Sequence, residues 1–232
     1  YLRNVLKHKD AADVTLFEHN VFRANLSQAL DFLSEKRIIT YQDFLTVHRI
    51  LFSDYYPWAG EDRRMTLPDL AVRKQGVLFS HPQECQRAVE HGLGLGANKK
   101  YMSDRPGEIM GLFAFGHPFL DGNGRTILLV HMELAYRAGF SIAWANTNKN
   151  YYLTALTEEI NTPSNRSLDS YLLQFKTSRQ ERDKWGSEIL ALKGLDGLDA
   201  DNQIDGNVSD PTVMPKYAEI HAHRGYSYES QD

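Results

Sequence analysis

Apolar side chains recur at intervals of three to four residues along most of this chain. In the segment that begins at Thr15, for example, Phe22, Leu26 and Leu33 fall on one face of an α-helix. Six further segments share this period, and Gly139 follows one of them as a typical C-terminal helix glycine. Helices are therefore predicted over residues 15–33, 40–51, 81–89, 106–115, 126–138, 149–160 and 168–192.

Residues with good capping side chains precede several of these helices. Thr40 followed by Asp43 resembles a capping box, in which each side chain binds a free backbone N–H group. Ser80 and Asp104 are expected to cap the helices that begin beside Pro82 and Pro106.

Strand character is confined to two short segments. Residues 63–67 and 76–79 predict a small β-hairpin joined by the loop 68–75. The expected fold is therefore all-α, a helical body with one β-hairpin flap.

The composition changes at Gly194. Residues 194–210 contain five Asp and three Gly with few apolar residues, which is typical of a linker or surface loop. We therefore expect a domain over residues 1–193 and an acidic linker with a loop-rich C-terminal tail over 194–232. Beyond Pro215, four apolar or aromatic residues are expected to dock onto the body: Tyr217, Ile220, Tyr226 and Tyr228.

Charge and cysteine content exclude several classes of protein. Lys and Arg total 26 against 30 Asp and Glu, a balance that argues against a dedicated nucleic-acid binder. The single cysteine, Cys85, excludes a disulfide framework, and no apolar run is long enough for a membrane span. A cytoplasmic protein is expected. The acidity belongs to residues 194–232, since the rest of the chain is slightly basic.

One polar segment lies between two predicted helices. Gly122 and Gly124 allow the backbone to approach a ligand, and the free N–H groups that open the next helix favour an anion. Arg125 can bind a phosphate through two N–H groups, and Asp121 offers the oxygen ligand that Mg²⁺ prefers. His117 can accept a proton near neutral pH. These residues predict a magnesium–nucleotide site with a general base beside it.

The same segment carries a family resemblance. Residues 117–125 read H-P-F-L-D-G-N-G-R and resemble the signature of Fic-domain proteins. The Y-P-W-A-G of residues 56–60 and the segment 73–79 resemble two further elements of that family, the second being its hairpin flap. The resemblance covers about residues 11–190. It implies a helical Fic fold that transfers AMP from ATP onto a hydroxyl group of a target protein.

The resemblance also implies a role for each motif residue. His117 would deprotonate the Ser, Thr or Tyr hydroxyl of the target, Asp121 would hold Mg²⁺, and Arg125 would bind the β-phosphate of ATP. Phe119 would anchor the loop in the core. The anion hole around the α-phosphate would be formed by Gly122, Asn123 and Gly124.

The implied partner is the target protein itself. A segment of the target would add as a strand to the flap near Val77, Leu78 and Phe79. No nucleic-acid or membrane partner is expected.

The sequence departs from the family pattern at one position. A second arginine should stand at position 128, where it would contact the γ-phosphate and pair with an inhibitory glutamate, but this chain has Leu128. Other donors therefore stay open, namely phosphoryl transfer from ATP and transfer of UMP or phosphocholine. A catalytically idle nucleotide-binding adaptor also stays open. Because the chain lacks the inhibitory motif, a separate inhibitor or antitoxin protein is expected, and delivery to a host cell as an effector is an alternative to a purely cytoplasmic role.

Overall fold

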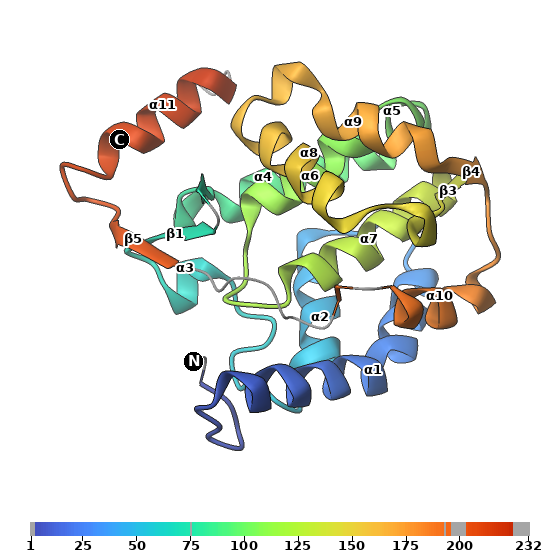
Figure 1. Ribbon diagram of the computed structural model, residues 1–232, viewed down its shortest axis with the longest axis horizontal. Coiled ribbons are helices and arrows are strands. Elements are labelled where there is room, and N and C mark those ends of the chain that lie inside the picture. Colours follow the sequence, from blue (N-terminus) through green and yellow to red (C-terminus); the bar gives the residue numbers. More distant parts are fainter. Residues whose placement is uncertain (1–2, 75, 193, 196–202, 225–232) are drawn as a thin grey trace.

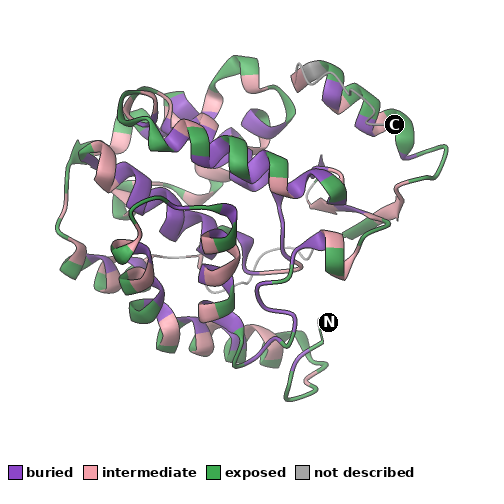
Figure 2. Ribbon diagram, turned by 180° about the vertical axis from the view of Figure 1, so that it is seen from behind, coloured by how far each residue is buried: buried purple, intermediate pink, exposed green. Residues whose placement is uncertain are grey.

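Two buried helices form the centre of the molecule. The computed structural model describes residues 3–74, 76–192, 194–195 and 203–224. Helices α6 (Pro106–Gly116) and α7 (Asn123–Ala138) cross its middle, and most of their residues are buried (Figures 1 and 2). Their sequences lack a broad polar face, so both helices are covered on several sides.

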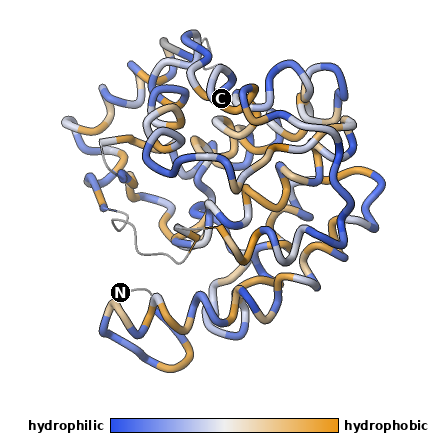
Figure 3. The backbone as a smooth tube through the Cα atoms, turned by 45° about the vertical axis from the view of Figure 1, so that its right-hand side comes forward, coloured by the Kyte–Doolittle hydropathy of each residue, from blue (hydrophilic) through white to orange (hydrophobic). Residues whose placement is uncertain are grey.

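Helices with more exposed residues surround this centre. In Figure 1, α1, α2 and α10 lie below α7, while α4, α8 and α9 lie above it. Apolar and polar positions alternate along these outer helices (Figure 3), which agrees with the period read from the sequence. Their bounds are α1 Ala11–Glu35, α2 Tyr41–Phe52, α4 Cys85–Ala97, α5 Lys99–Asp104, α8 Lys149–Asn161, α9 Ser167–Leu172 and α10 Trp185–Ala191. Single 3₁₀ turns cover Pro82–Glu84, Trp144–Asn146, Pro163–Asn165, Leu173–Phe175 and Arg182–Lys184.

Two of the predicted helix ends are confirmed. The Thr40 side chain accepts a hydrogen bond from the Asp43 N–H, and the Asp43 carboxylate accepts one from the Thr40 N–H, which completes the capping box of α2. Helix α7 ends at Gly139, whose φ of +94° is the left-handed conformation expected of a glycine there.

The two other predicted caps are wrong, because the chosen side chains lie beside different partners. Ser80 donates a hydrogen bond to the carbonyl oxygen of Gly116 at 3.0 Å, and His81 caps the 3₁₀ turn ahead of α4 by accepting from the Gln83 N–H. Asp104 forms an ion pair with Lys100 on the surface of α5.

The cap of α6 comes from a residue far away in the sequence. Asp169 of α9 accepts hydrogen bonds from the N–H groups of Gly107 at 2.7 Å and Glu108 at 3.2 Å, and it also binds the Arg105 guanidinium. A Cβ on Gly107 would lie 2.1 Å from the Asp169 nitrogen, so only glycine permits this approach. Asp169 thereby joins the start of α6 to α9.

The flap is confirmed as a hairpin, but its strands are shifted along the chain. Residues 63–66 form the short helix α3 (Arg63–Thr66), because Asp62 caps its first turn by accepting from the Arg64 N–H. Strand β1 (Leu70–Lys74) lies in the predicted loop, and it pairs antiparallel with β2 (Val77–Leu78).

The C-terminal region contains more regular structure than the predicted linker and loop-rich tail. Strand β5 (Gln203–Asn207) pairs antiparallel with the free edge of β1, so the sheet order is β2-β1-β5. An ion pair of 2.8 Å between Asp205 and Arg73 joins the two strands. The acidic residues that predicted a loop thus include Asp205, which is the ion-pair partner of Arg73 in the flap.

The expected docking of the tail is confirmed for its described residues. Helix α11 (Met214–Arg224) lies over the flap (Figure 1), and Tyr217 and Val213 are buried with Ala71 and Leu78 in a small apolar cluster that Ile220 contacts. Positions 226 and 228 lie outside the described residues.

The long helix predicted over residues 168–192 is wrong. The segment is divided into α9, strand β4 (Lys176–Ser178) and α10, and β4 pairs antiparallel with β3 (Phe140–Ile142), which directly follows α7. Lys176 also donates to the Ser103 carbonyl oxygen at 2.7 Å. These partners are distant in sequence, so periodicity alone could not reveal the break. Within the described ranges, every helix is either too short or too polar to cross a membrane.

The cap from Asp169 generates a stability prediction. We expect Asp169→Ala to lower the free energy of unfolding by about 2–4 kcal/mol, because it leaves two N–H groups without their acceptor and removes one of the two carboxylates that pair with Arg105. The matched control is Asp104→Ala, whose exposed ion pair with Lys100 should contribute little to the free energy of unfolding. Urea unfolding of both variants measures the difference, and equal losses would contradict the role of Asp169.

Candidate active site

The loop between α6 and α7 places the predicted site residues at the edge of the core. We call residues 117–122 the motif loop. It begins at His117, whose φ of +40° ends α6, and it closes at Gly122, whose φ of +73° opens α7. A Cβ at Gly122 would lie 2.5 Å from the Phe52 ring and 3.0 Å from His48. The turn into α7 therefore requires glycine for both conformation and space.

A fully buried arginine holds the start of the motif loop. The Nε of Arg63 donates to the His117 carbonyl oxygen at 2.7 Å, and its Nη2 donates to the carbonyl oxygens of Ser80 at 2.7 Å and Gly116 at 3.2 Å. Its backbone N–H donates to the Pro118 carbonyl oxygen. The sequence pattern placed Arg63 in a strand and did not predict this role, because no local signal marks it.

A buried histidine holds the other end of the motif loop. The Gly60 N–H donates to Nδ1 of His48 at 2.9 Å, so the ring proton sits on Nε2, which donates to the Asp121 carbonyl oxygen at 3.0 Å. Burial lowers the pKa of His48 to about 3, so the ring is neutral near pH 7. The ring also stacks on Phe119, with centroids 3.7 Å apart. His48 thus joins the Y-P-W-A-G element to the motif loop.

Phe119 and Asn123 close the motif loop internally. Phe119 is fully buried, as expected for an anchor. The Asn123 side chain accepts from the Phe119 N–H at 3.0 Å and donates to the Phe119 carbonyl oxygen at 2.7 Å. Its amide is therefore engaged with the loop, and its predicted place in an anion hole depends on its backbone.

The flap covers the His117 ring. Phe79, directly after β2, stacks face to face on that ring with centroids 3.6 Å apart and an interplanar angle of 4°. His117 is 8% exposed. The side chains of Val77 and Leu78 are buried, and Leu78 faces α11. The structure thus brings the flap residues and His117 together, with β2 at one end of the sheet.

Arg125 lies in a buried ion pair that the sequence pattern did not predict. Its guanidinium binds the carboxylate of Glu18 on α1, and Tyr56 of the Y-P-W-A-G element donates to the same carboxylate at 2.9 Å. The guanidinium also lies over the Phe52 ring, 4.8 Å from its centroid. One signal was available, since Glu18 is four residues before Phe22 on the apolar face of the predicted helix. A charged residue on such a face needs a partner.

Asp121 is the most exposed charged side chain of the motif. Its carboxylate is 44% exposed and lies 3.8 Å from the Arg125 guanidinium. A Cβ at Gly124, in the first turn of α7, would meet only open space. One accessible carboxylate beside a helix N-terminus suits Mg²⁺ that is bound partly through substrate phosphates. In the described part of the chain, no cluster of three His, Cys, Asp or Glu residues forms an all-protein metal site.

Position 128 adds no charge to this site. Leu128 is 6% exposed and packs within the apolar core. Leu128 therefore contributes to core packing and provides no positive charge to the site.

These features agree with the match to a family model. Residues 38–135 match the model of the Fic/DOC family, a range that runs from α2 almost to the end of α7 and includes the whole motif loop. Over this range the chain resembles a Fic/DOC family domain. The resemblance read from residues 117–125 is thereby confirmed.

Two curated proteins are similar to this chain in sequence. Protein adenylyltransferase VbhT of Bartonella schoenbuchensis is 35% identical over 122 residues, which cover 48% of this chain and 24% of VbhT. The matched region thus spans about a quarter of that protein. The probable protein adenylyltransferase y4lH of Sinorhizobium fredii is 24% identical over 164 residues, covering 67% of this chain and 81% of y4lH.

Solved structures confirm the fold. BepC from Bartonella tribocorum, crystallised with AMPPNP, superposes with a TM-score of 0.63 at 17% identity, covering 77% of this chain and 93% of BepC. The N-terminal Fic domain of a Bartonella quintana effector, crystallised with ADP, gives 0.62 at 21% identity, covering 82% and 94%. At these identities the likeness concerns the fold alone.

The buried, neutral His48 generates a pH prediction. Its pKa is about 3 in the folded state and about 6.5 when unfolded, so the unfolded chain binds the extra proton between these values. Stability is therefore lost as the pH falls below about 6.5. Between pH 6 and 4 this residue should add about 1.4 kcal/mol per pH unit to the fall in the free energy of unfolding.

Urea unfolding of the wild type and of His48→Gln at pH 4, 5, 6 and 7 measures this contribution. We expect the slope of unfolding free energy against pH to decrease in the variant, whatever its absolute stability. His91→Gln, at an exposed position, is the control and should keep the wild-type slope. Identical slopes for wild type and His48→Gln would show that His48 is not buried as a neutral ring.

Proposed function

We propose that this Fic domain transfers AMP from ATP to a Ser, Thr or Tyr hydroxyl of a target protein. The observation that carries the proposal is the motif loop itself, which brings His117, Asp121 and the start of α7 together at one edge of the core. Both curated relatives are named as adenylyltransferases, and two structural relatives were crystallised with AMPPNP or ADP.

His117 is the proposed general base. It removes the proton from the target hydroxyl, whose oxygen then attacks the α-phosphorus of ATP. The bond from that phosphorus to the β-phosphate oxygen breaks, and pyrophosphate leaves. The Arg63 hydrogen bond to the His117 carbonyl and the stacking of Phe79 support this role, because they fix the position of the ring.

The start of α7 is the proposed phosphate site. The helix has 16 residues, and no side chain caps its first turn, so its N–H groups and dipole favour an anion. Arg125 and Asp121 are 3.8 Å apart, which supports a β-phosphate on Arg125 next to an Mg²⁺ ion on Asp121. When bound, Mg²⁺ supplies charge neutralisation for the phosphates. Glu18 keeps the Arg125 guanidinium ordered beneath this site.

The outer edge of β2 is the proposed docking site for the target. Strand β2 ends the sheet order on the side of Phe79 and His117, whereas β5 occupies the opposite edge of β1. An added target strand would form backbone hydrogen bonds with β2 and bring its hydroxyl beside His117. Since the side chains of β2 are buried, the backbone carries this recognition.

The structural relatives also bear on where such an activity would operate. Both are described as VirB-translocated Bartonella effector proteins. We include delivery into a host cell, and control by a separate inhibitor protein, in the proposal for this chain.

A second candidate function is nucleotide binding without transfer, as an adaptor. Leu128 is the observation that favours it, because a buried leucine contributes no cation to the γ-phosphate. Because of Leu128, the alternatives of transferring a phosphoryl group, UMP or phosphocholine also stay open.

The transfer assay uses α-labelled ATP, Mg²⁺ and a cell lysate as the source of targets. We expect labelled protein with the wild type and at least about a hundredfold less with His117→Ala, since a general base contributes 10²–10⁴-fold. Asp104→Ala, on the surface of α5, is the control and should label at the wild-type rate. Undiminished labelling by His117→Ala would contradict the mechanism.

Changing the donor separates the remaining alternatives. Label transferred from γ-labelled ATP would identify phosphoryl transfer, and label from α-labelled UTP or from CDP-choline would identify the other donors. Saturable ATP binding without label from any donor would favour the adaptor.

A further inference from the structure

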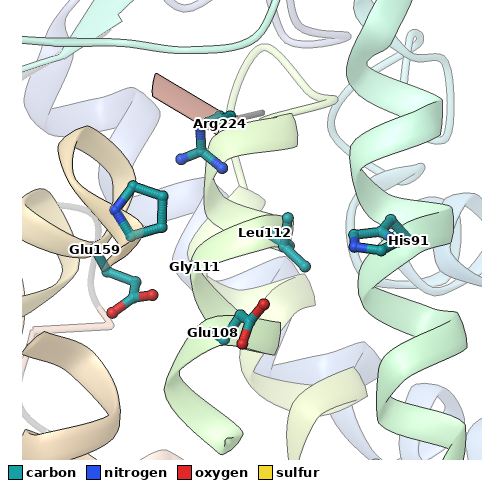
Figure 4. A pocket seen from close by; sticks show the side chains of 7 residues that line it. His91, Glu108, Gly111, Leu112, Glu159 and Arg224 are labelled. Atoms are coloured by element: carbon teal, nitrogen blue, oxygen red, sulfur yellow. The ribbon is translucent and has the colours of Figure 1, made fainter. Parts of the chain in front are cut away.

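A groove on α6 lies apart from the motif loop. It has a volume of about 130 Å³, and none of residues 117–125 lines it. Figure 4 shows α6 as its floor, with α4 on one side and Glu159 of α8 on the other. The lining residues are His91, Glu108, Gly111, Leu112, Glu159, Pro163 and Arg224.

The groove contains a buried carboxylate whose hydrogen bonding is incomplete. Glu159 is 2% exposed, and its Oε2 accepts from the Leu168 N–H at 3.2 Å. Its Oε1 has no hydrogen-bond partner among the described residues. Gly111 makes room for this side chain, since a Cβ there would lie 2.6 Å from the Glu159 Cγ. A buried acceptor without a donor is unfavourable, so the arrangement points to a missing donor.

The charged groups around Glu159 leave its charge largely unmatched. Burial raises the pKa of Glu159 to about 7, and the carboxylates of Asp169 and Glu108 act in the same direction, against Arg105. Arg105 itself pairs with both of those carboxylates. Arg224, at the other end of the groove, donates to the Ile160 carbonyl oxygen and lies over the Phe115 ring.

The chemistry and size of the groove define the class of ligand. An unmatched carboxylate favours a cation that also donates hydrogen bonds, and Leu112 and Pro163 offer apolar contact to an alkyl chain. Among the described residues, no cluster of three or more His, Cys, Asp or Glu side chains that could hold a metal ion lies at this groove. Because a cavity of roughly 150 Å³ can hold benzene, this one has room for about six non-hydrogen atoms.

We propose that this groove binds a small primary amine, whose ammonium group pairs with Glu159. The amine displaces water from the groove, and its N–H groups bind Oε1. This site is independent of AMP transfer, and it assigns Glu159 a role as a ligand-binding residue.

The test titrates the protein with n-butylammonium at pH 8 and follows backbone amides by two-dimensional NMR. We expect saturable shifts at Leu168, whose N–H binds Glu159, and at Gly111. Glu159→Gln should weaken binding at least tenfold. Glu158→Gln, at the exposed neighbouring position of α8, is the matched control and should stay within twofold of the wild type.

One further arm needs no variant and remains decisive if Glu159→Gln folds poorly. Neutral n-butanol has the same shape without the charge and should give no saturable shift. Between pH 8 and 6 the wild-type affinity should fall about tenfold, because Glu159, with a pKa of about 7, becomes protonated while the amine stays charged. His91 and Glu108 also face the groove, so the same pH series on Glu159→Gln isolates Glu159. Equal binding of butanol, or affinity that does not change with pH, would overturn the proposal.

Discussion

The guanidinium of Arg63 is buried in the protein, and the geometry of the motif loop depends on how its charge is satisfied. Three backbone carbonyl groups, from Ser80, Gly116 and His117, accept its hydrogen bonds. A buried cation that lost these acceptors would be strongly unfavourable. The flap, the end of α6 and the start of the motif loop are therefore held in one fixed arrangement, and the His117 ring takes its position from that arrangement.

A second buried polar residue completes this constraint from the opposite side. His48 connects Gly60 to the Asp121 carbonyl oxygen while its ring stacks on Phe119. Its neutral form is required, because both ring nitrogens are engaged, one as an acceptor and one as a donor. The exposed carboxylate of Asp121 is thus carried by a backbone that His48 holds in place, which is the preorganisation that the proposed phosphate site needs. The Glu18 carboxylate likewise holds the Arg125 guanidinium in place in the first turn of α7.

The tail shows how local composition misleads when a distant partner exists. Residues 194–210 are acidic and poor in apolar side chains, yet β5 forms because β1 offers an unpaired edge and Arg73 offers a charge for Asp205. The segment 168–192 misleads in the opposite way. Its helical period is real, but pairing with β3 divides it, since backbone hydrogen bonds to a neighbouring strand replace those of the helix.

The amino-acid sequence by itself determined the helical body, the hairpin flap and the motif from His117 to Arg125, since apolar period, capping residues and a contiguous signature are local properties. Only the tertiary structure decided which residues hold that motif in place. Arg63, His48 and Glu18 lie 54, 73 and 107 positions from the motif residues they bind. Asp169 caps α6 from 62 positions away. A buried charge or ring nitrogen takes whichever partner folding brings within about 3 Å, and one-dimensional spacing carries no record of that choice.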